Sequence, residues 1–153
     1  MKPQHVQELR AFNRFYTNII GLLDRHILNS NYSLPEVRIM YELYHRSTLT
    51  ASDIIALIDI DKGYLSRILK KFEKSKLINK ISSPSDKRTS VVQLSPKGKK
   101  EFETLNKASD KQIETFLKNL PEKDCDELIK KINEAQKLLK KGYGHEWDKI
   151  KVD

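Results

Sequence analysis

Cationic side chains that could contact phosphate groups are concentrated in the middle of this 153-residue sequence. The segment from Lys62 to Lys100 holds twelve Lys or Arg residues and two acids, Glu73 and Asp86. The whole chain carries a net charge of +8, so the residues outside this segment are slightly acidic. A basic patch on a nearly neutral body is typical of proteins that bind a phosphate backbone. The alternative interpretation is a basic surface that only keeps the protein soluble.

The first part of this segment predicts a helix over 62–74 that has an apolar face and a cationic face. The apolar face repeats at helical spacing and comprises Leu65, Ile68, Leu69 and Phe72. The outward face offers donors for the bases and phosphates of duplex DNA, and its candidate contacts are Lys62, Tyr64, Ser66, Arg67, Lys70 and Lys71.

Within this face, Arg67 is the candidate for a bidentate contact to guanine, because a planar guanidinium matches the two acceptors of that base. Lys70 and Lys71 are assigned to phosphates, which fix register without reading sequence. A solvated helix face with salt-bridge partners is the alternative interpretation.

Two short β-branched segments, 77–81 and 90–94, predict a β-hairpin with a polar tip that contains Asp86, Lys87 and Arg88. An arginine on such a loop can enter a narrow minor groove. Asp86 could orient Arg88 through a charge-assisted hydrogen bond. Alternatively, Asp86 only closes the turn that begins at Ser83.

Capping-box patterns precede two further helices, one beginning after Ser33 and one after Thr50. The second of these helices and the helix over 62–74 form a helix-turn-helix pattern, and the hairpin follows it directly. Residues 33–95 therefore predict a winged helix-turn-helix with a two-stranded β wing. Ser52, in the first turn of the helix after Thr50, is a further candidate DNA contact.

Long helices predicted over 5–30 and 96–141 flank this unit, and a tail over 142–153 shows no periodicity. The first and last of these helices carry more apolar surface than contact with one neighbouring helix can bury, which favours a dimer. The expected fold class is mainly α (α+β), with residues 1–153 as a single domain.

The stretch from Leu49 to Gly98 resembles the MarR family of bacterial transcriptional regulators. The segment IDKGYLSRIL over 60–69 resembles its recognition helix, Asp86-Lys87-Arg88 its Asp-x-Arg wing motif, and LSPKG over 94–98 its exit into a long helix. Ser75-Lys76 departs from the family, which usually has a glycine before the wing. The resemblance implies a homodimer with interleaved terminal helices, a pseudo-palindromic operator, and a small anionic or aromatic effector.

The expected function is that of a sequence-specific, double-stranded DNA-binding transcriptional regulator, acting as a homodimeric repressor that an effector relieves. Arg14, Tyr16, Tyr41 and His45 are candidates for an effector pocket, although ordinary core packing explains them equally well. The alternative function is a winged-helix protein–protein interaction module without ligand sensing.

The sequence offers little support for an enzyme, a cofactor or a metal site. Its four histidines are scattered, and it has no glycine-rich phosphate loop. The single cysteine, Cys125, lies on an apolar helical stripe and is interpreted as a packing residue rather than a nucleophile. No apolar run has the length of a membrane span, and a cytoplasmic location is expected.

Overall fold

The computed structural model describes residues 1–20, 30–82 and 90–143. The fold is a mostly helical winged helix with long flanking helices, as the sequence predicts. Its elements in chain order are α1 (Pro3–Ile19), α2 (Leu34–Arg46), β1 (Leu49–Thr50), α3 (Ala51–Ile58), α4 (Lys62–Lys74), β2 (Ile78–Ser82), β3 (Ser90–Leu94), α5 (Pro96–Leu117) and α6 (Glu122–Tyr143).

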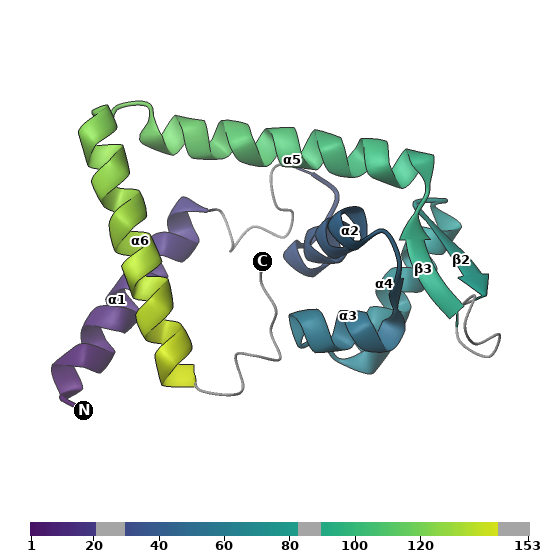
Figure 1. The fold of residues 1–153 in the computed structure, drawn as a ribbon, viewed down its shortest axis with the longest axis horizontal. Coiled ribbons are helices and arrows are strands. Elements are labelled where there is room, and N and C mark those ends of the chain that lie inside the picture. Colours follow the sequence, from purple (N-terminus) through teal and green to yellow (C-terminus); the bar gives the residue numbers. More distant parts are fainter. Residues whose placement is uncertain (21–29, 83–89, 144–153) are drawn as a thin grey trace.

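The elements form two groups that α5 connects (Figure 1). Helices α2, α3 and α4 gather beside the small sheet at one end of the molecule. Helix α5 starts at the sheet, crosses α2 and runs to the opposite end, where α1 and α6 lie. Pro121 lies in the turn between α5 and α6. A proline disfavours helical geometry in the residue before it, which explains the break between the two helices.

Side-chain caps start the helices of the winged unit at the predicted residues. The Glu36 carboxylate accepts a hydrogen bond from the Ser33 backbone N–H at 2.8 Å. Asp53 accepts from the Thr50 backbone N–H at 2.8 Å, and the Thr50 hydroxyl accepts from the Asp53 N–H at 3.1 Å. Both capping boxes are confirmed, and each satisfies backbone donors that the helix start leaves unpaired.

The sheet has three antiparallel strands in the order β1-β3-β2, whereas the sequence predicted two. The predicted hairpin is present, with Ile78 opposite Leu94 and Ser82 opposite Ser90. The additional strand, β1, pairs Leu49 with Val92 on the other edge of β3. A strand of two residues has no detectable periodicity, so the sequence pattern could not predict it.

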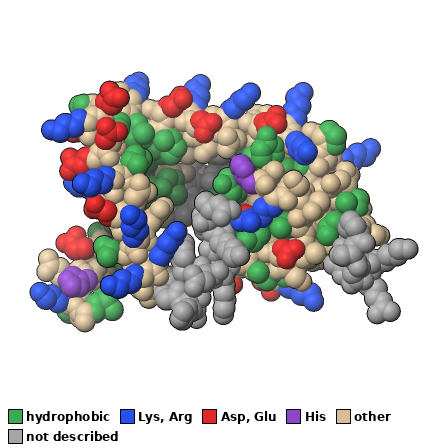
Figure 2. Space-filling model, viewed as in Figure 1, with side chains coloured by type: hydrophobic (Ala, Val, Ile, Leu, Met, Phe, Trp, Pro, Cys, Tyr) green, Lys and Arg blue, Asp and Glu red, His purple; other side chains and the backbone are tan. Residues whose placement is uncertain are grey.

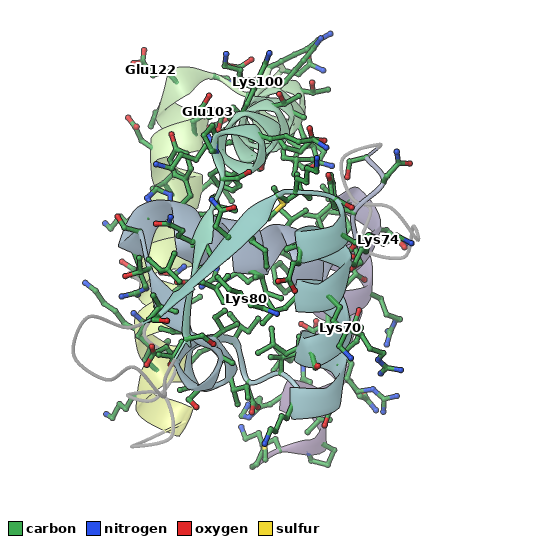
Figure 3. All side chains as sticks on the ribbon, turned by 90° about the vertical axis from the view of Figure 1, so that its right-hand side faces the viewer. Lys70, Lys74, Lys80, Lys100, Glu103 and Glu122 are labelled. Carbon is green, nitrogen blue, oxygen red and sulfur yellow. The ribbon has the colours of Figure 1, made fainter. Side chains whose placement is uncertain are left out.

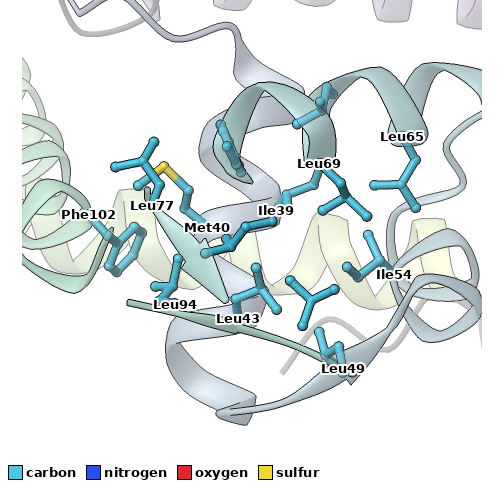
Figure 4. Packing of buried hydrophobic residues seen from close by; sticks show 14 of the residues in the cluster. Ile39, Met40, Leu43, Leu49, Ile54, Leu65, Leu69, Leu77, Leu94 and Phe102 are labelled. Carbon is cyan, nitrogen blue, oxygen red and sulfur yellow. The ribbon is translucent and has the colours of Figure 1, made fainter. Parts of the chain in front are cut away.

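The hydrophobic core lies between the three short helices, the sheet and the first turns of α5 (Figure 4). Its fully buried side chains include Ile39 and Met40 of α2, Ile54 of α3 and Phe72 of α4. Phe102 extends this core onto α5. The winged unit and the start of α5 therefore form one packed body, which holds α4 in a fixed orientation.

Helices α1 and α6 and the end of α5 instead expose apolar side chains. No residue of α1 is buried, and Phe15 of this helix is 62% exposed. On α6, Leu138 is 71% exposed. Apolar side chains also gather at the surface in the corner between α5 and α6 (Figure 2). In the described ranges, no helix has an apolar stretch long enough to cross a bilayer.

Ser75-Lys76 stands before the wing, where the family that the sequence resembles usually has a glycine. Lys76 has a left-handed backbone there, with φ 59°. A side chain in this region is strained, and glycine is not. We expect Lys76→Gly to raise the free energy of unfolding by about 1 kcal/mol in urea titrations. Ser75→Gly is the control, because Ser75 has an ordinary φ of −82° and should gain nothing. A Lys76→Gly protein that is less stable than the parent would contradict this account.

Candidate nucleic-acid interface and ligand cavity

The cationic face of α4 points away from the core. Leu65, Ile68 and Phe72 are at most 3% exposed and fix the opposite face of the helix in the core. Lys70 and Lys74 project from the outer side of α4 (Figure 3). The predicted contacts on this helix are exposed, except for Tyr64, which is half-buried: Lys62, Tyr64, Ser66, Arg67, Lys70 and Lys71. Lys74 belongs to the same face and was omitted from the predicted set.

The start of α4 orients its candidate base-reading residue. Asp61 caps the helix by accepting the Tyr64 backbone N–H at 2.8 Å. The Arg67 guanidinium carbon lies 5.6 Å from the centre of the Tyr64 ring, within cation–π range. This contact restricts Arg67 to one side of the helix while leaving its donors exposed. Arg67 is therefore presented to the solvent from the second turn of α4, where a base edge can approach.

Lys71 differs from the other cations of α4 because it has an ion-pair partner within the protein. Its ammonium lies 2.7 Å from Glu36 of α2, whose side chain is 8% exposed. The ammonium also lies 5.7 Å from the centre of the Tyr32 ring. Lys70 and Lys74 have no ion-pair partner among the described residues. The assignment of Lys71 to a DNA phosphate stays a prediction.

The remaining predicted DNA contacts lie on α3 and at the wing tip. Ser52 is exposed in the first turn of α3. Asp86, Lys87 and Arg88 lie outside the described residues, so their orientation stays a prediction. Nearer the base of the wing, Lys80 on β2 pairs with Glu73 at 2.7 Å. Both side chains of this pair are exposed, and such pairs contribute little to stability.

A cavity of about 340 Å³ lies between α1, α2 and α5. Its wall is mainly apolar and aromatic, with a few polar groups, which is typical of small-molecule sites. The lining residues are Tyr16, Ile20, Leu34, Val37, Arg38, Tyr41, Phe102, Leu105, Asn106, Ser109, Gln112 and Ile113.

Two of the four residues proposed for an effector pocket line this cavity, Tyr16 and Tyr41. His45 does not line it; its ring packs on Tyr41 with centroids 4.4 Å apart. Arg14 is exposed on α1 and also does not line it. Arg38 was not among the predicted pocket residues. It lies one helical turn before Glu42 and brings a positive charge to the cavity wall.

Arg38 is held by contacts on both sides of its guanidinium. It lies 2.8 Å from the buried carboxylate of Glu42 and 5.2 Å from the centre of the Tyr41 ring. Arg46 contacts the same carboxylate at 3.0 Å, so Glu42 is compensated by two cations. A buried carboxylate needs such compensation. Arg38 thus keeps a fixed position in which it can meet an anionic group in the cavity.

Two tyrosine hydroxyls connect the winged unit to α5. The Tyr44 hydroxyl donates to Glu103 at 3.1 Å, and the Tyr32 hydroxyl donates to Glu101 at 3.3 Å. Burial, together with the Glu101 carboxylate, raises the pKa of Tyr32 to about 12, so this hydroxyl keeps its proton. The segment that carries Tyr32 is therefore attached to both α5 and Lys71 of α4.

The Glu36–Lys71 pair gives a pH-dependent contribution to stability. Burial alone would raise the pKa of Glu36, but hydrogen bonds from Lys71 and Ser33 outweigh it and lower the pKa. A lowered folded-state pKa stabilises the fold above the pKa of an unfolded glutamate, and this stabilisation is lost as the pH falls through the folded-state value.

We therefore expect Glu36→Gln to cost about 1.5 to 3 kcal/mol near pH 7, because a charged hydrogen-bond partner is lost. The difference from the parent should shrink as the pH falls below about 4. Urea unfolding at several pH values measures it. Glu127→Gln, which breaks an exposed pair on α6, is the control and should change stability little. A Glu36→Gln difference that grows toward acid pH would contradict the assignment.

Comparison with known protein families finds one family model that matches the winged unit. A family model described as the MarR family matches residues 32–90. Among curated relatives, the transcriptional regulator MhqR of Bacillus subtilis is 23% identical over 125 residues, covering 80% of this chain and 86% of MhqR. The uncharacterised regulator YdgJ of the same organism is 25% identical over 88 residues, covering 58% of this chain. That match spans about half of YdgJ, 54% of its length.

Solved structures share the fold at low sequence identity. A cysteine mutant of MarR from E. coli, complexed with operator DNA, superimposes with a TM-score of 0.67 at 16% identity, covering 86% of this chain and 95% of that one. BpsR of Bordetella bronchiseptica, whose DNA binding is regulated by 6-hydroxynicotinic acid, superimposes with a TM-score of 0.65 at 15% identity. The superposition covers 85% of this chain and 98% of BpsR. At these identities the structures establish a common fold.

Proposed function

From the match of a MarR family model to residues 32–90 and the similarity to MhqR, we propose that this chain is a sequence-specific DNA-binding transcriptional regulator. In this proposal it acts as a homodimer and represses transcription at the operator it occupies. The observation that supports this most directly is the outward cationic face of α4. Arg67, Lys70 and Lys74 are exposed together on a helix whose other face is fixed in the core. A rigid helix with cations on its free face suits the major groove of duplex DNA.

The homodimer is supported by the exposed apolar side chains at the far end of the molecule. Phe12 and Phe15 of α1 are 56% and 62% exposed, and Ile129 of α6 is 50% exposed. Apolar surface of this extent is unfavourable in water and is expected to be covered by another protein surface. A second copy of the chain would present the same surface, as a two-fold interface requires. Two recognition helices could then contact major grooves about 34 to 36 Å apart, one turn of duplex.

Selection of bound sequences from a random duplex pool tests the proposed function. We expect a consensus with two-fold symmetry, and half-sites spaced by about one helical turn, 10 to 10.5 base pairs. Analytical ultracentrifugation of the complex should give two chains per duplex. Failure to enrich any sequence would contradict sequence-specific binding, and enrichment of a single asymmetric half-site would contradict the symmetric dimer.

Arg88→Ala tests the part of the proposal that concerns the wing. An arginine inserted in a narrow minor groove strengthens DNA binding, because the negative potential is enhanced there. We expect the variant to bind the selected operator about tenfold or more weakly, in line with the loss of one good contact, while it remains a folded dimer. Fluorescence anisotropy and ultracentrifugation measure the two properties. Full operator affinity would reject the assignment of Arg88 to the minor groove.

The cavity between α1, α2 and α5 supports the proposal that a small anionic or aromatic effector binds this protein. It combines the aromatic rings of Tyr16 and Tyr41 with the guanidinium of Arg38. An occupant would contact helices of both the dimer end and the winged unit, so it could alter the spacing of two recognition helices. Titration with 6-hydroxynicotinic acid as a probe tests this for one anionic aromatic compound. A compound that binds in the cavity without changing operator affinity would contradict an effector role.

A further inference from the structure

The ion pair between Glu36 and Lys71 joins two helices that are distant in sequence. The Lys71 ammonium on the last turn of α4 donates a hydrogen bond to Glu36 Oε1 on the first turn of α2 at 2.7 Å. Glu36 is buried, whereas Lys71 is about half-exposed. The pair therefore connects a fixed carboxylate of the core to the edge of the cationic face of α4.

The Glu36 carboxylate is fixed by more than Lys71. Its other oxygen, Oε2, accepts from the backbone N–H of Ser33 at 2.8 Å and from the Ser33 hydroxyl at 3.1 Å. Both oxygens thus have partners, one in the cap of α2 and one on α4. Because the cap places the carboxylate, the position of the Lys71 ammonium follows from the position of the α2 N-terminus.

The neighbouring lysine of α4 provides a contrast. Lys70 is exposed and has no ion-pair partner among the described residues. A phosphate would therefore meet the Lys70 ammonium without competition. At Lys71 the same phosphate would have to share an ammonium that already neutralises the buried Glu36 carboxylate, so it would gain less there than at Lys70.

We propose that Glu36 is a positioning residue for the recognition helix, and that Lys71 serves as its partner on α4 rather than as a phosphate contact. Removal of either charge leaves the last turn of α4 less firmly attached to α2, and the cationic face then fits the groove less well. This inference rests on the proposed DNA-binding function for its binding readout, and it replaces the phosphate role that the sequence suggested for Lys71.

The test compares four proteins on the operator selected from the random pool: the parent, Glu36→Gln, Lys71→Gln and the double variant. The Gln at position 36 can still accept the Ser33 N–H. We expect each single variant to bind about threefold to tenfold more weakly, and the double variant to bind no more weakly than either, as for two residues that act through one contact. Lys71→Arg, which keeps the charge, should retain operator affinity.

Salt dependence separates positioning from phosphate contact. We expect Lys70→Gln, the matched control, to lower the log–log salt slope by about 0.9, the value for one neutralised phosphate. Lys71→Gln should leave the slope at the parental value. A Lys71→Gln slope that falls as much as that of Lys70→Gln, or losses from the two single variants that multiply in the double variant, would overturn the inference.

Unfolding of the same four proteins in urea examines the pair without DNA. Glu36→Gln should cause little further destabilisation in a protein that already carries Lys71→Gln. Additive effects of the two substitutions on the unfolding midpoint would contradict an interaction between Glu36 and Lys71. If the parent shows no salt-dependent DNA binding, the proposed function fails, while this unfolding cycle still decides whether Glu36 and Lys71 act together.

Discussion

Arg67→Ala is expected to weaken operator binding about tenfold to hundredfold and to relax base preference at one position of each half-site. Arg67 is exposed on the cationic face of α4, and the Tyr64 ring restricts its guanidinium. A bidentate contact to guanine uses the O6 and N7 acceptors of that base. Replacement of a candidate guanine by 7-deazaguanine removes N7, so this change should weaken the parent and leave Arg67→Ala unaffected.

Lys70→Ala is the matched control for Arg67, because it removes a cation from the same exposed face. A phosphate contact carries no sequence information, so this variant should weaken binding to all duplexes alike. Anisotropy titrations on the operator, the deaza operator and an unrelated duplex measure both variants. An Arg67→Ala protein that loses affinity equally for every duplex would assign Arg67 to the backbone instead of a base.

Gly98→Ala is expected to destabilise the fold strongly, although it removes no side chain. A Cβ atom at Gly98 would lie 2.0 Å from the backbone oxygen of Leu77, far inside van der Waals contact. That oxygen cannot move freely, because it accepts the Ser95 N–H at 2.9 Å. The close approach places the start of α5 directly on the wing, so the added methyl group must push these elements apart.

We expect Gly98→Ala to cost more than about 3 kcal/mol in urea unfolding, at the upper end of overpacking effects. Gly142→Ala provides the control, since nothing lies within 4 Å of a Cβ at that position of α6. This substitution should be neutral or stabilising by up to about 1 kcal/mol, because alanine favours helices over glycine. Equal stabilities of the two variants would contradict the described packing of α5 on the wing.

The sequence predicted the features of the fold that depend on local residue patterns. The starts of α2 and α3 follow from their capping boxes, and the buried face of α4 follows from apolar residues at helical spacing. The hairpin follows from two β-branched segments around a polar turn. In each case the stabilising contacts are made within a few residues of one another, so the pattern is visible in the chain.

Features that depend on distant contacts were not predicted. Strand β1 exists because Leu49 and Thr50 pair with β3, more than forty residues later. The cavity residue Arg38 was missed because its orientation depends on Glu42 and Tyr41 as well as on the placement of α1 and α5. Arg14 and His45 have suitable chemistry, but the faces that they occupy do not border the cavity.

The candidate DNA-binding surface shows the same division. The outward face of α4 could be predicted, because it is the complement of the apolar stripe on a single helix. The distinction between Lys70 and Lys71 could not, because it depends on Glu36, 35 residues earlier in the chain. Adjacent lysines with the same charge thus have different surroundings, and only the tertiary structure reveals the difference.

Methylation interference on the selected operator tests the central claim most directly, because methylation at guanine N7 blocks contacts in the major groove. If two copies of α4 read the duplex, methylation should interfere at guanines in two clusters about 10 base pairs apart, and the Arg67→Ala protein should lose sensitivity within both clusters. Binding that tolerates methylation of every guanine N7 in the site, with full affinity in the parent protein, would contradict recognition of the major groove by this helix.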